Sequence, residues 1–500
     1  MSIRTRARRA GVLLAGGALA ASGLSAGLGL AGPAPVAHAA DVPSPEAKAV
    51  SAWLQAQLAD GLLAGNIAWT ADLGLSALAS GTDTPELLAQ LNTGLDARHA
   101  DILSGAPVTA AEVVAFQAQS QAEGADADLV QVVADATDDT TGAFTDGQAW
   151  KQVWAVSALQ AAGNAEAAKA AAFLRADQCA TGAWGWGTAC DGGTDYDTTA
   201  RGVLALLPFA DEDPAAQTAV DDAVTWLEGE LAADGGIGES MYTPINTQST
   251  GLVAWALGAA GSALAPKAAS YVAGRQLVKL TGCASPLDVE HGAIAYSDDD
   301  VTTARKDGKI DAADRGYQWI WPSAQALAGL AYLSNPVTGR VTGPTGYVHA
   351  GTTVAVKVTG LRSSQPACLS GFGTTRRVAG PLSTTVKLPA STGNRVLALR
   401  WLGGTTATTT IKALAAKTFR PVLRSTTVAR GGTQVVAVSG LAPGERFVVA
   451  YAGRQVGAGT ATSKGAIRVT FAVGRTAGVK SVVVRGQFSD RRGSTTFRVR

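Results

Sequence analysis

The sequence predicts a multidomain α + β protein, an (α/α)6 toroid followed by two Ig-like β-sandwiches. Three observations carry this prediction. A helical repeat of about fifty residues occurs twice between Phe173 and Gly261. Paired helical segments fill residues 41–336, which we assign to the toroid. From Val337 the apolar residues alternate instead, in two copies offset by 80 residues that we assign to sandwiches at 337–417 and 418–500.

The N-terminus is typical of a secretory signal peptide at residues 1–39. Arg4, Arg6, Arg8 and Arg9 precede an Ala/Gly/Leu-rich run, and the small-residue site Ala37-His38-Ala39 follows it. We expect a mature protein without a transmembrane span that is secreted or associated with the cell envelope.

The two clear repeats share one order of features: a helix, a Gly/aromatic loop and a capped second helix. The first copy contains Phe173-Leu174, Gln178, Gly182, Trp184 and Asp197-Thr198-Thr199-Ala200. The second contains Trp226-Leu227, Glu230, Gly235-Gly236-Ile237 and Asn246-Thr247-Gln248-Ser249-Thr250. Such a unit cannot bury its apolar face alone, so it predicts stacked copies.

Six helix pairs can be assigned along the chain. They are 45–62 with 69–78, 85–101 with 109–121, 128–135 with 148–162, 166–177 with 198–209, 215–231 with 247–260, and 267–280 with 322–333. The second helix of each pair is the more apolar and Ala-rich, as expected of an inner ring packed on all sides. Six pairs suit closure into a toroid.

Two motifs resemble those of prenyltransferase/squalene-oxidase repeats. One is the loop Phe/Trp-Leu…Gln…Gly-x-Trp, and the other is the start of the inner helix, Asn/Asp…Ser/Thr-Thr. Such repeats occur in terpenoid cyclases, protein prenyltransferase β subunits and cobalamin carriers. The chain is most similar to secreted actinobacterial proteins that carry these repeats and end in β domains. The resemblance covers the toroid, and its motif is clear in the fourth and fifth pairs.

The catalytic motifs of these families are not intact. The cyclases need Asp-x-Asp-Asp, whereas this chain has Asp195-Tyr196-Asp197-Thr198 at a helix start, where Asp is a common N-cap. Zinc could be bound by Cys283, Asp288, Glu290 and His291, but the sequence spacing of these residues differs from that of the prenyltransferase zinc ligands. We therefore expect no cofactor and favour a non-enzymatic role.

In an (α/α)6 toroid the loops before the inner helices gather on one face, the mouth, where helix N-termini attract ligands. Eight aromatic residues are predicted to bind a ligand there: Trp69, Trp150, Trp184, Trp186, Tyr196, Tyr242, Trp319 and Trp321. The first hypothesis is a binding protein for a small apolar, aromatic or carbohydrate ligand. The alternative to ligand binding is that each ring packs between loops and helix ends and holds them together.

Two other functional hypotheses stay open. A terpenoid-cyclase-like or carbohydrate-active enzyme would use mouth carboxylates, with candidates Asp195, Asp197 and Glu239. A structural or adhesive surface protein would hold no small ligand.

One acidic loop matches part of a calcium-binding pattern. Asp307, Asp311 and Asp314 match the second half of an EF-hand loop, but Thr303 and Arg305 occupy its first two ligand positions. A solvated turn is the competing interpretation.

All four cysteines lie in the predicted exported portion, where disulfides persist. We predict a bridge between Cys179 and Cys190, which flank the loop of the first repeat. The pairing of Cys283 and Cys368 stays open. Because Cys283 belongs to a mouth loop and the last inner helix ends on the opposite face, we expect these two residues to lie far apart.

The two β copies align over a long motif. Gly351-Thr352-Thr353…Gly360-Leu361 recurs as Gly431-Gly432-Thr433…Gly440-Leu441, with alternating valines between. Short strands separated by Gly/Pro/Thr turns predict Ig-like sandwiches.

The net charge of +1 is the sum of two large and opposite contributions from different parts of the chain. Residues 41–336 contain 38 Asp/Glu and 13 Lys/Arg, a net −25, whereas residues 337–500 contain 2 and 24, a net +22. Either the two parts keep each other soluble, or the basic part contacts an anionic cell-wall polymer or other anionic surface. We expect no nucleic-acid partner.

Overall fold

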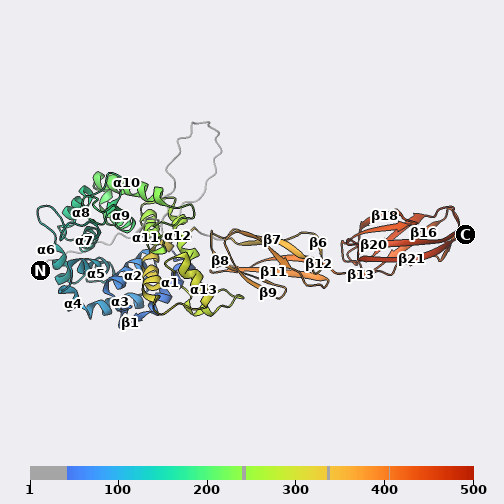
Figure 1. Cartoon of the computed structure of the whole chain (residues 1–500), viewed down its shortest axis with the longest axis horizontal. Coiled ribbons are helices and arrows are strands. Elements are labelled where there is room, and N and C mark those ends of the chain that lie inside the picture. Colours follow the sequence, from blue (N-terminus) through green and yellow to red (C-terminus); the bar gives the residue numbers. More distant parts are fainter. Residues whose placement is uncertain (1–41, 239–243, 335–337, 405) are drawn as a thin grey trace, which may run out of the picture. The chain divides into compact units, whose positions relative to one another are not determined.

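The structure, a computed structural model, describes residues 42–238, 244–334, 338–404 and 406–500 (Figure 1). The predicted signal peptide lies outside these residues. Among the helices that are described, none combines the length and hydrophobicity that a membrane crossing requires.

Six helical segments form an inner ring. They are α2 (Ile67–Ser80), α5 (Pro107–Ser120), α7 (Ala149–Ala161), α9 (Tyr196–Ala210), α11 (Thr247–Ala259), and α14 (Trp321–Ala326) continued by the 3-10 turn η3 (Ala328–Tyr332). Each segment packs against the next, and α14 and η3 pack against α2. The ring is therefore closed, as the sequence predicts for a toroid.

The outer helices each pack against an inner one. They are α1 (Pro45–Gln55), α3 (Pro85–Asp96) with α4 (His99–Leu103), α6 (Ala127–Asp135), α8 (Ala167–Ala176), α10 (Pro214–Glu230) and α12 (Ala265–Gly274). Short elements fill the loops: β1 (Leu58–Ala59), β2 (Leu62–Leu63), β3 (Trp184–Gly185), β4 (Thr194–Asp195), η1 (Pro286–Glu290), α13 (Asp298–Asp307) and the short π-helix η2 (Gly316–Ile320).

The repeat motif has a physical basis in how neighbouring pairs join. Gln178 donates to the carbonyl oxygens of Gly182, in its own loop, and Ala219, on the next outer helix, at 2.7 and 2.8 Å. Gly182 has φ +91°, and a Cβ there would lie 2.5 Å from the Asp222 carbonyl oxygen. Glycines with positive φ that touch the next outer helix recur at Gly61, Gly142, Gly235 and, against α1, Gly292. The loop thus locks each pair to the following one.

The first β-sandwich has two sheets. One has the order β10 (Leu382–Lys387), β7 (Thr353–Thr359), β5 (Arg340–Thr342); the other has β6 (Tyr347–His349), β12 (Ala407–Leu414), β11 (Gly393–Trp401), β8 (Pro366–Gly371), β9 (Thr374–Ala379). Their apolar faces enclose a core that includes Val356, Leu399 and Ile411.

The second sandwich is built in the same way. One sheet has the order β14 (Val422–Leu423), β16 (Thr433–Val438), β19 (Ile467–Ala472). The other has β13 (Lys417–Thr418), β21 (Arg491–Val499), β20 (Gly478–Arg485), β17 (Arg446–Tyr451), β18 (Arg454–Thr460), with β15 (Thr427–Val428) also paired to β21. Strands β7 and β16 begin 80 residues apart, in agreement with the repeat seen in the sequence.

Both cysteine pairs are bonded. Cys179 and Cys190 form the predicted bridge. Cys283 and Cys368 also form a disulfide, so the expectation that they lie far apart is wrong. The segment after α12 does not stay at the mouth: Val278, Leu280 and Cys283 form a small apolar cluster with Cys368.

Candidate functional site

A cavity of about 250 Å³ opens among the first turns of the inner helices, and we call it the mouth cavity. It is lined by Ala68, Trp69, Asp72, Glu112, Trp150, Val153, Trp154, Trp186, Asp195, Asp197, Thr198, Arg201, Gln248, Trp321 and Gln325. Side chains on α2, α5, α7, α9, α11 and α14, far apart in the sequence, thus converge on one space.

The position of these side chains follows from how the inner helices begin. Asn66 caps α2 by accepting from the Trp69 amide at 3.0 Å, and Asp195 caps α9 by accepting from the Thr198 amide at 2.7 Å. A capped first turn fixes the backbone, so the residues one turn later face the ring axis in a set geometry.

Aromatic rings form two groups at the mouth cavity. Trp69 and Trp321 stack with centroids 6.0 Å apart and planes at 11°, and Tyr317 meets Trp69 edge-on at 5.3 Å. Trp150 and Trp186 lie 5.2 Å apart. Trp186 is 58% exposed and offers an open aromatic face at the cavity rim.

Three predicted aromatic residues do not line the cavity. Trp184 is fully buried and donates from Nε1 to the Leu174 carbonyl oxygen at 2.8 Å. Trp319 is buried in the toroid core. Tyr196 stacks on Trp226 at 5.3 Å. These rings hold helices and loops together, as the competing interpretation expects, while Tyr242 and Glu239 lie outside the described residues.

The two aspartates predicted at the start of α9 have different environments. Asp195 accepts hydrogen bonds from both the amide and the hydroxyl of Thr198, so it acts as an N-cap. Asp197 accepts from Gln248 Nε2 at 3.2 Å. Burial raises the pKa of Asp197 to about 6, and the charge of Asp195 adds to the increase.

A third carboxyl group, Glu112 on α5, was not among the residues selected from the sequence. Its side chain makes no hydrogen bond or ion pair within the described ranges. Burial raises the pKa of Glu112 to about 8, the charge of Asp72 adds to the increase and Arg201 opposes it. At neutral pH Glu112 therefore carries a proton and can donate it, whereas Asp197 is mostly ionised and accepts.

Arg201 is the cation of this site and was also missed. It donates to Asp72 at 2.7 Å, and its guanidinium lies 3.9 Å over the Trp154 ring. Gln325 donates to the other Asp72 oxygen, also at 2.7 Å. A signal was present in the sequence: Asp72, Glu112 and Arg201 interrupt apolar inner helices, and charges buried in such helices are normally paired.

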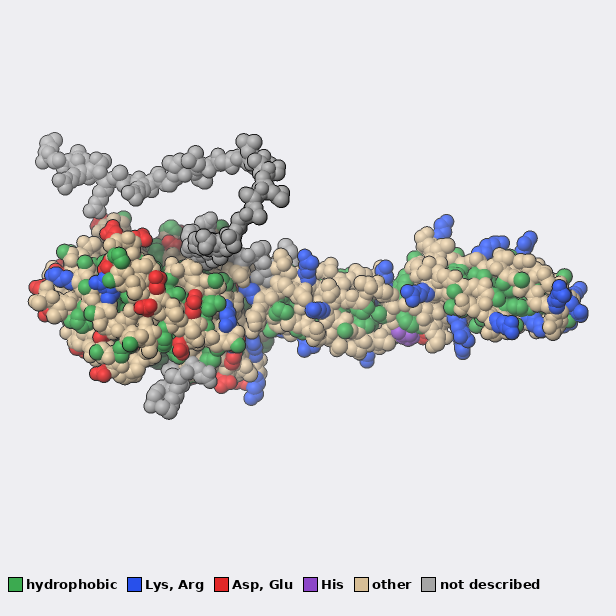
Figure 2. Space-filling view, turned by 90° about the horizontal axis from the view of Figure 1, so that it is seen from above, with side chains coloured by type: hydrophobic (Ala, Val, Ile, Leu, Met, Phe, Trp, Pro, Cys, Tyr) green, Lys and Arg blue, Asp and Glu red, His purple; other side chains and the backbone are tan. Residues whose placement is uncertain are grey.

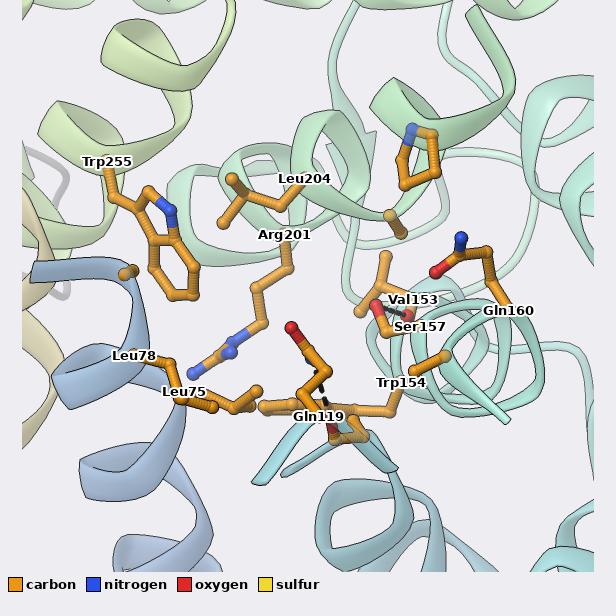
Figure 3. Close-up of a pocket in the computed structure, with 15 residues that line it drawn as sticks. Leu75, Leu78, Gln119, Val153, Trp154, Ser157, Gln160, Arg201, Leu204 and Trp255 are labelled. Carbon is orange, nitrogen blue, oxygen red and sulfur yellow. Dashed lines mark hydrogen bonds between the residues drawn. The ribbon is translucent and has the colours of Figure 1, made fainter. Parts of the chain in front are cut away.

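A second cavity, of about 510 Å³, lies beyond Arg201 toward the C-terminal ends of the inner helices (Figure 3). It is mainly apolar, with Leu75, Leu78, Leu204 and Trp255 in its wall, and nothing in the sequence predicted it. Val153, Trp154 and Arg201 line both cavities. The Arg201–Asp72 ion pair therefore lies between the aromatic, charged mouth cavity and the apolar second cavity.

The three residues of the calcium prediction lie at the end of a helix and in the segment that follows it. Residues 298–307 form α13, so Thr303, Arg305 and Asp307 are helical and not in a loop. Asp311 accepts from the Ala313 amide at 2.9 Å, which makes a local turn. Within the described ranges, the group of His, Cys, Asp or Glu side chains close enough to share an ion is His99, Asp126 and Asp128, and it does not include the predicted residues.

Comparison with known proteins gives weak likenesses. No family model matches the chain. Enfumafungin synthase from Hormonema carpetanum is 36% identical over 102 residues, which cover 19% of this chain and 8% of that protein. The chain therefore spans a small part of the length of this curated relative, and the match does not establish a family.

Solved structures resemble separate parts of the chain. The ent-copalyl diphosphate synthase from Streptomyces platensis is 18% identical, with 53% of this chain and 50% of that one covered and a TM-score of 0.36. A possible GH105 family member from Salmonella enterica is 11% identical, with 60% and 97% covered and a TM-score of 0.40. The Escherichia coli adhesin FdeC is 18% identical, with 32% and 64% covered and a TM-score of 0.25. None of these likenesses assigns a function.

Proposed function

We propose that this is an exported binding protein whose mouth cavity takes a small hydroxyl-rich ligand, of the kind presented by a sugar ring. The observation that carries the proposal is the open face of Trp186 beside a floor formed by Glu112, Asp197 and Gln248. Aromatic faces pack against the C–H surface of a ring, and hydrogen-bonding groups fix its orientation.

The polar floor favours a carbohydrate over an apolar or purely aromatic ligand. An apolar ligand would strip water from Asp197 and Arg201 without replacing its hydrogen bonds, which is unfavourable for charged groups. Hydroxyl groups both donate and accept, so they suit an ionised Asp197 and a protonated Glu112 together. The two disulfides support the exported location, because they form in oxidising compartments.

A glycan array followed by calorimetry on residues 40–500 tests this proposal. We expect a mono- or oligosaccharide to bind, and Trp186→Ala to weaken binding about tenfold because the stacked face is lost. Trp226→Ala is the matched control, since Trp226 stacks on Tyr196 and does not line the cavity. Equal losses in the two variants, or no glycan bound, would reject the proposal.

A second candidate is an enzyme that uses mouth carboxyl groups. The observation in its favour is that the pKa values of Glu112 and Asp197 differ, about 8 and about 6, in one cavity, which fits an acid and a base acting together. Hydrolysis of chromogenic glycosides would be measured. Loss of turnover in Glu112→Gln with binding retained would favour the enzyme. Binding without turnover in the unmodified protein would favour the non-enzymatic binding protein.

A further inference from the structure

The second sandwich carries a large excess of positive charge, and both of its acidic residues are bonded. Residues 418–500 contain 14 Lys/Arg and 2 Asp/Glu. Glu445 is buried and bonded to Arg491 at 2.6 and 2.7 Å, and Asp490 bonds His349 at 2.6 Å. Within the described part of the chain, Arg491 is the member of this basic set that has an acidic partner. Figure 2 shows these blue side chains spread over the face in view.

Three of these arginines meet on one outer sheet face. Along β21 buried and exposed residues alternate, which directs Arg492 outward with Arg498 further along the strand. Arg485 on β20 is directly opposite Arg492. Val448 on β17 is opposite Arg485, so Arg446 lies diagonally beside it on the same face. We call Arg446, Arg485 and Arg492 the arginine face.

This arrangement is unfavourable unless an anion is present. Side chains directly opposite on antiparallel strands lie about 5 Å apart, and like charges in those positions repel. Of the 14 basic residues, 12 are Arg and 2 are Lys. The guanidinium fork binds phosphate or carboxylate oxygens through two parallel hydrogen bonds, which Lys cannot do. A preference for Arg therefore indicates recognition of oxyanions and not only a need for solubility.

We propose that the arginine face binds an extended phosphodiester polymer. Adjacent guanidinium groups can share the oxygens of one phosphodiester, and Arg498 can take a second one further along β21, since six residues of strand span about 20 Å. The hydroxyl groups of Ser494 and Thr496 face the same side between them and leave the surface flat and uncharged. This site is separate from the mouth cavity and does not depend on the ligand proposed there.

The test compares two double variants of residues 40–500 that lose the same charge. Arg485→Gln with Arg492→Gln removes the opposed pair, and Arg424→Gln with Arg468→Gln removes two exposed arginines from the region of the other sheet, β14–β16–β19. The probe is poly(glycerol phosphate), with binding measured by microscale thermophoresis at several salt concentrations. Thermal melts establish that both variants are folded.

We expect the first variant to bind at least about tenfold more weakly and to depend less on salt, because two charge-assisted contacts are lost. The second variant should change by less than about threefold, since remote exposed charges are screened. Equal losses in both variants, or no binding by the unmodified protein, would overturn the proposal. Equal binding of a carboxylate polysaccharide, or binding only to anionic vesicles, would overturn the assignment to a phosphodiester polymer. Trp186→Ala should leave binding of poly(glycerol phosphate) unchanged. A failure of the polymer proposal can therefore be told apart from a failure of the mouth-cavity proposal.

Discussion

Single buried charges set the chemistry of the mouth cavity. Asp72, Glu112 and Arg201 stand on inner helices whose other residues are largely apolar, and all three line the cavity. Asp72 and Arg201 neutralise each other, whereas Glu112 has no hydrogen-bonding partner among the described residues and keeps its proton instead. The protonation of one residue therefore decides whether the cavity floor donates or accepts.

Glu112→Gln should flatten the dependence of stability on pH. The pKa of Glu112 rises from its ordinary 4.5 to about 8 on folding, so the folded state holds a proton that the unfolded chain releases. The resulting stabilisation is complete below pH 4.5 and is lost as the pH rises toward 8, by up to about 1.4 kcal/mol per pH unit. Urea unfolding of both proteins at pH 5, 6, 7 and 8 measures the difference. A constant difference across this range would contradict the raised pKa.

Asp72→Asn should destabilise the toroid by about 3 kcal/mol, because it leaves the Arg201 guanidinium buried without its counter-charge. The Asp72→Leu, Arg201→Met double variant should recover much of this loss, since replacing both members of a buried pair is often neutral. Chemical denaturation of the three proteins gives the comparison. If the double variant is less stable than Asp72→Asn, the pair contributes more than mutual neutralisation.

At the scale of elements, three glutamines and the loop glycines explain why the helix pairs assemble. Gln152 and Gln276 each donate twice, as Gln178 does, to the carbonyl oxygen of a loop glycine and to an outer helix. Gln276 reaches the Glu46 carbonyl oxygen, so it joins the last pair to the first and closes the ring. The repeat motif therefore encodes contacts between pairs more than the helices themselves.

Gln178→Ala should cost about 2 kcal/mol of folding free energy, because the Gly182 and Ala219 carbonyl oxygens would lose a donor in a site with little water. Gln131→Ala is the matched control, since among the described residues the Gln131 side chain bonds the exposed Asp135 on its own helix. Thermal unfolding of the two variants checks the prediction. Similar melting temperatures in both variants would mean that the two Gln178 hydrogen bonds make no measurable contribution to stability.

At the scale of the whole molecule, the two disulfides differ in what they restrain. Cys179–Cys190 closes a loop of 11 residues within one repeat. Cys283–Cys368 spans 85 residues and links the helical part to β8 of the first sandwich. Arg377 supports that link by bonding Asp288 at 2.8 Å and the Cys283 carbonyl oxygen at 2.8 Å.

Replacing both cysteines of the longer bridge by serine should destabilise the protein about 2 kcal/mol more than replacing both of the shorter one, because the entropy of the unfolded chain depends on loop length. Hydrogen exchange should also rise around Val278 and Cys368 in the Cys283→Ser, Cys368→Ser variant only. Unfolding in guanidinium under non-reducing conditions measures the first effect. A larger loss from the shorter bridge would contradict this account.

The sequence by itself determined the fold class, because periodicity records which faces are buried. The change from helical period to alternation marks where the helices give way to strands, and the repeat at Phe173–Gly261 indicates stacked pairs. It also included Trp69, Trp150, Trp186 and Trp321 among the eight aromatic residues expected at the mouth, since all lie before or at the start of inner helices. Local signals such as caps and loop glycines are sufficient for these conclusions.

Only the tertiary structure decided which aromatic residues line the cavity and which charges meet there. Trp184 and Trp186 are two residues apart, yet one is fully buried and the other is 58% exposed, because Trp184 in β3 packs into the toroid core whereas Trp186 lies beyond the end of this strand. Asp72 and Arg201 are 129 residues apart, and Cys283 and Cys368 are 85 apart. Ring closure and packing between domains bring such residues together, and no local pattern in the chain records the distance between them.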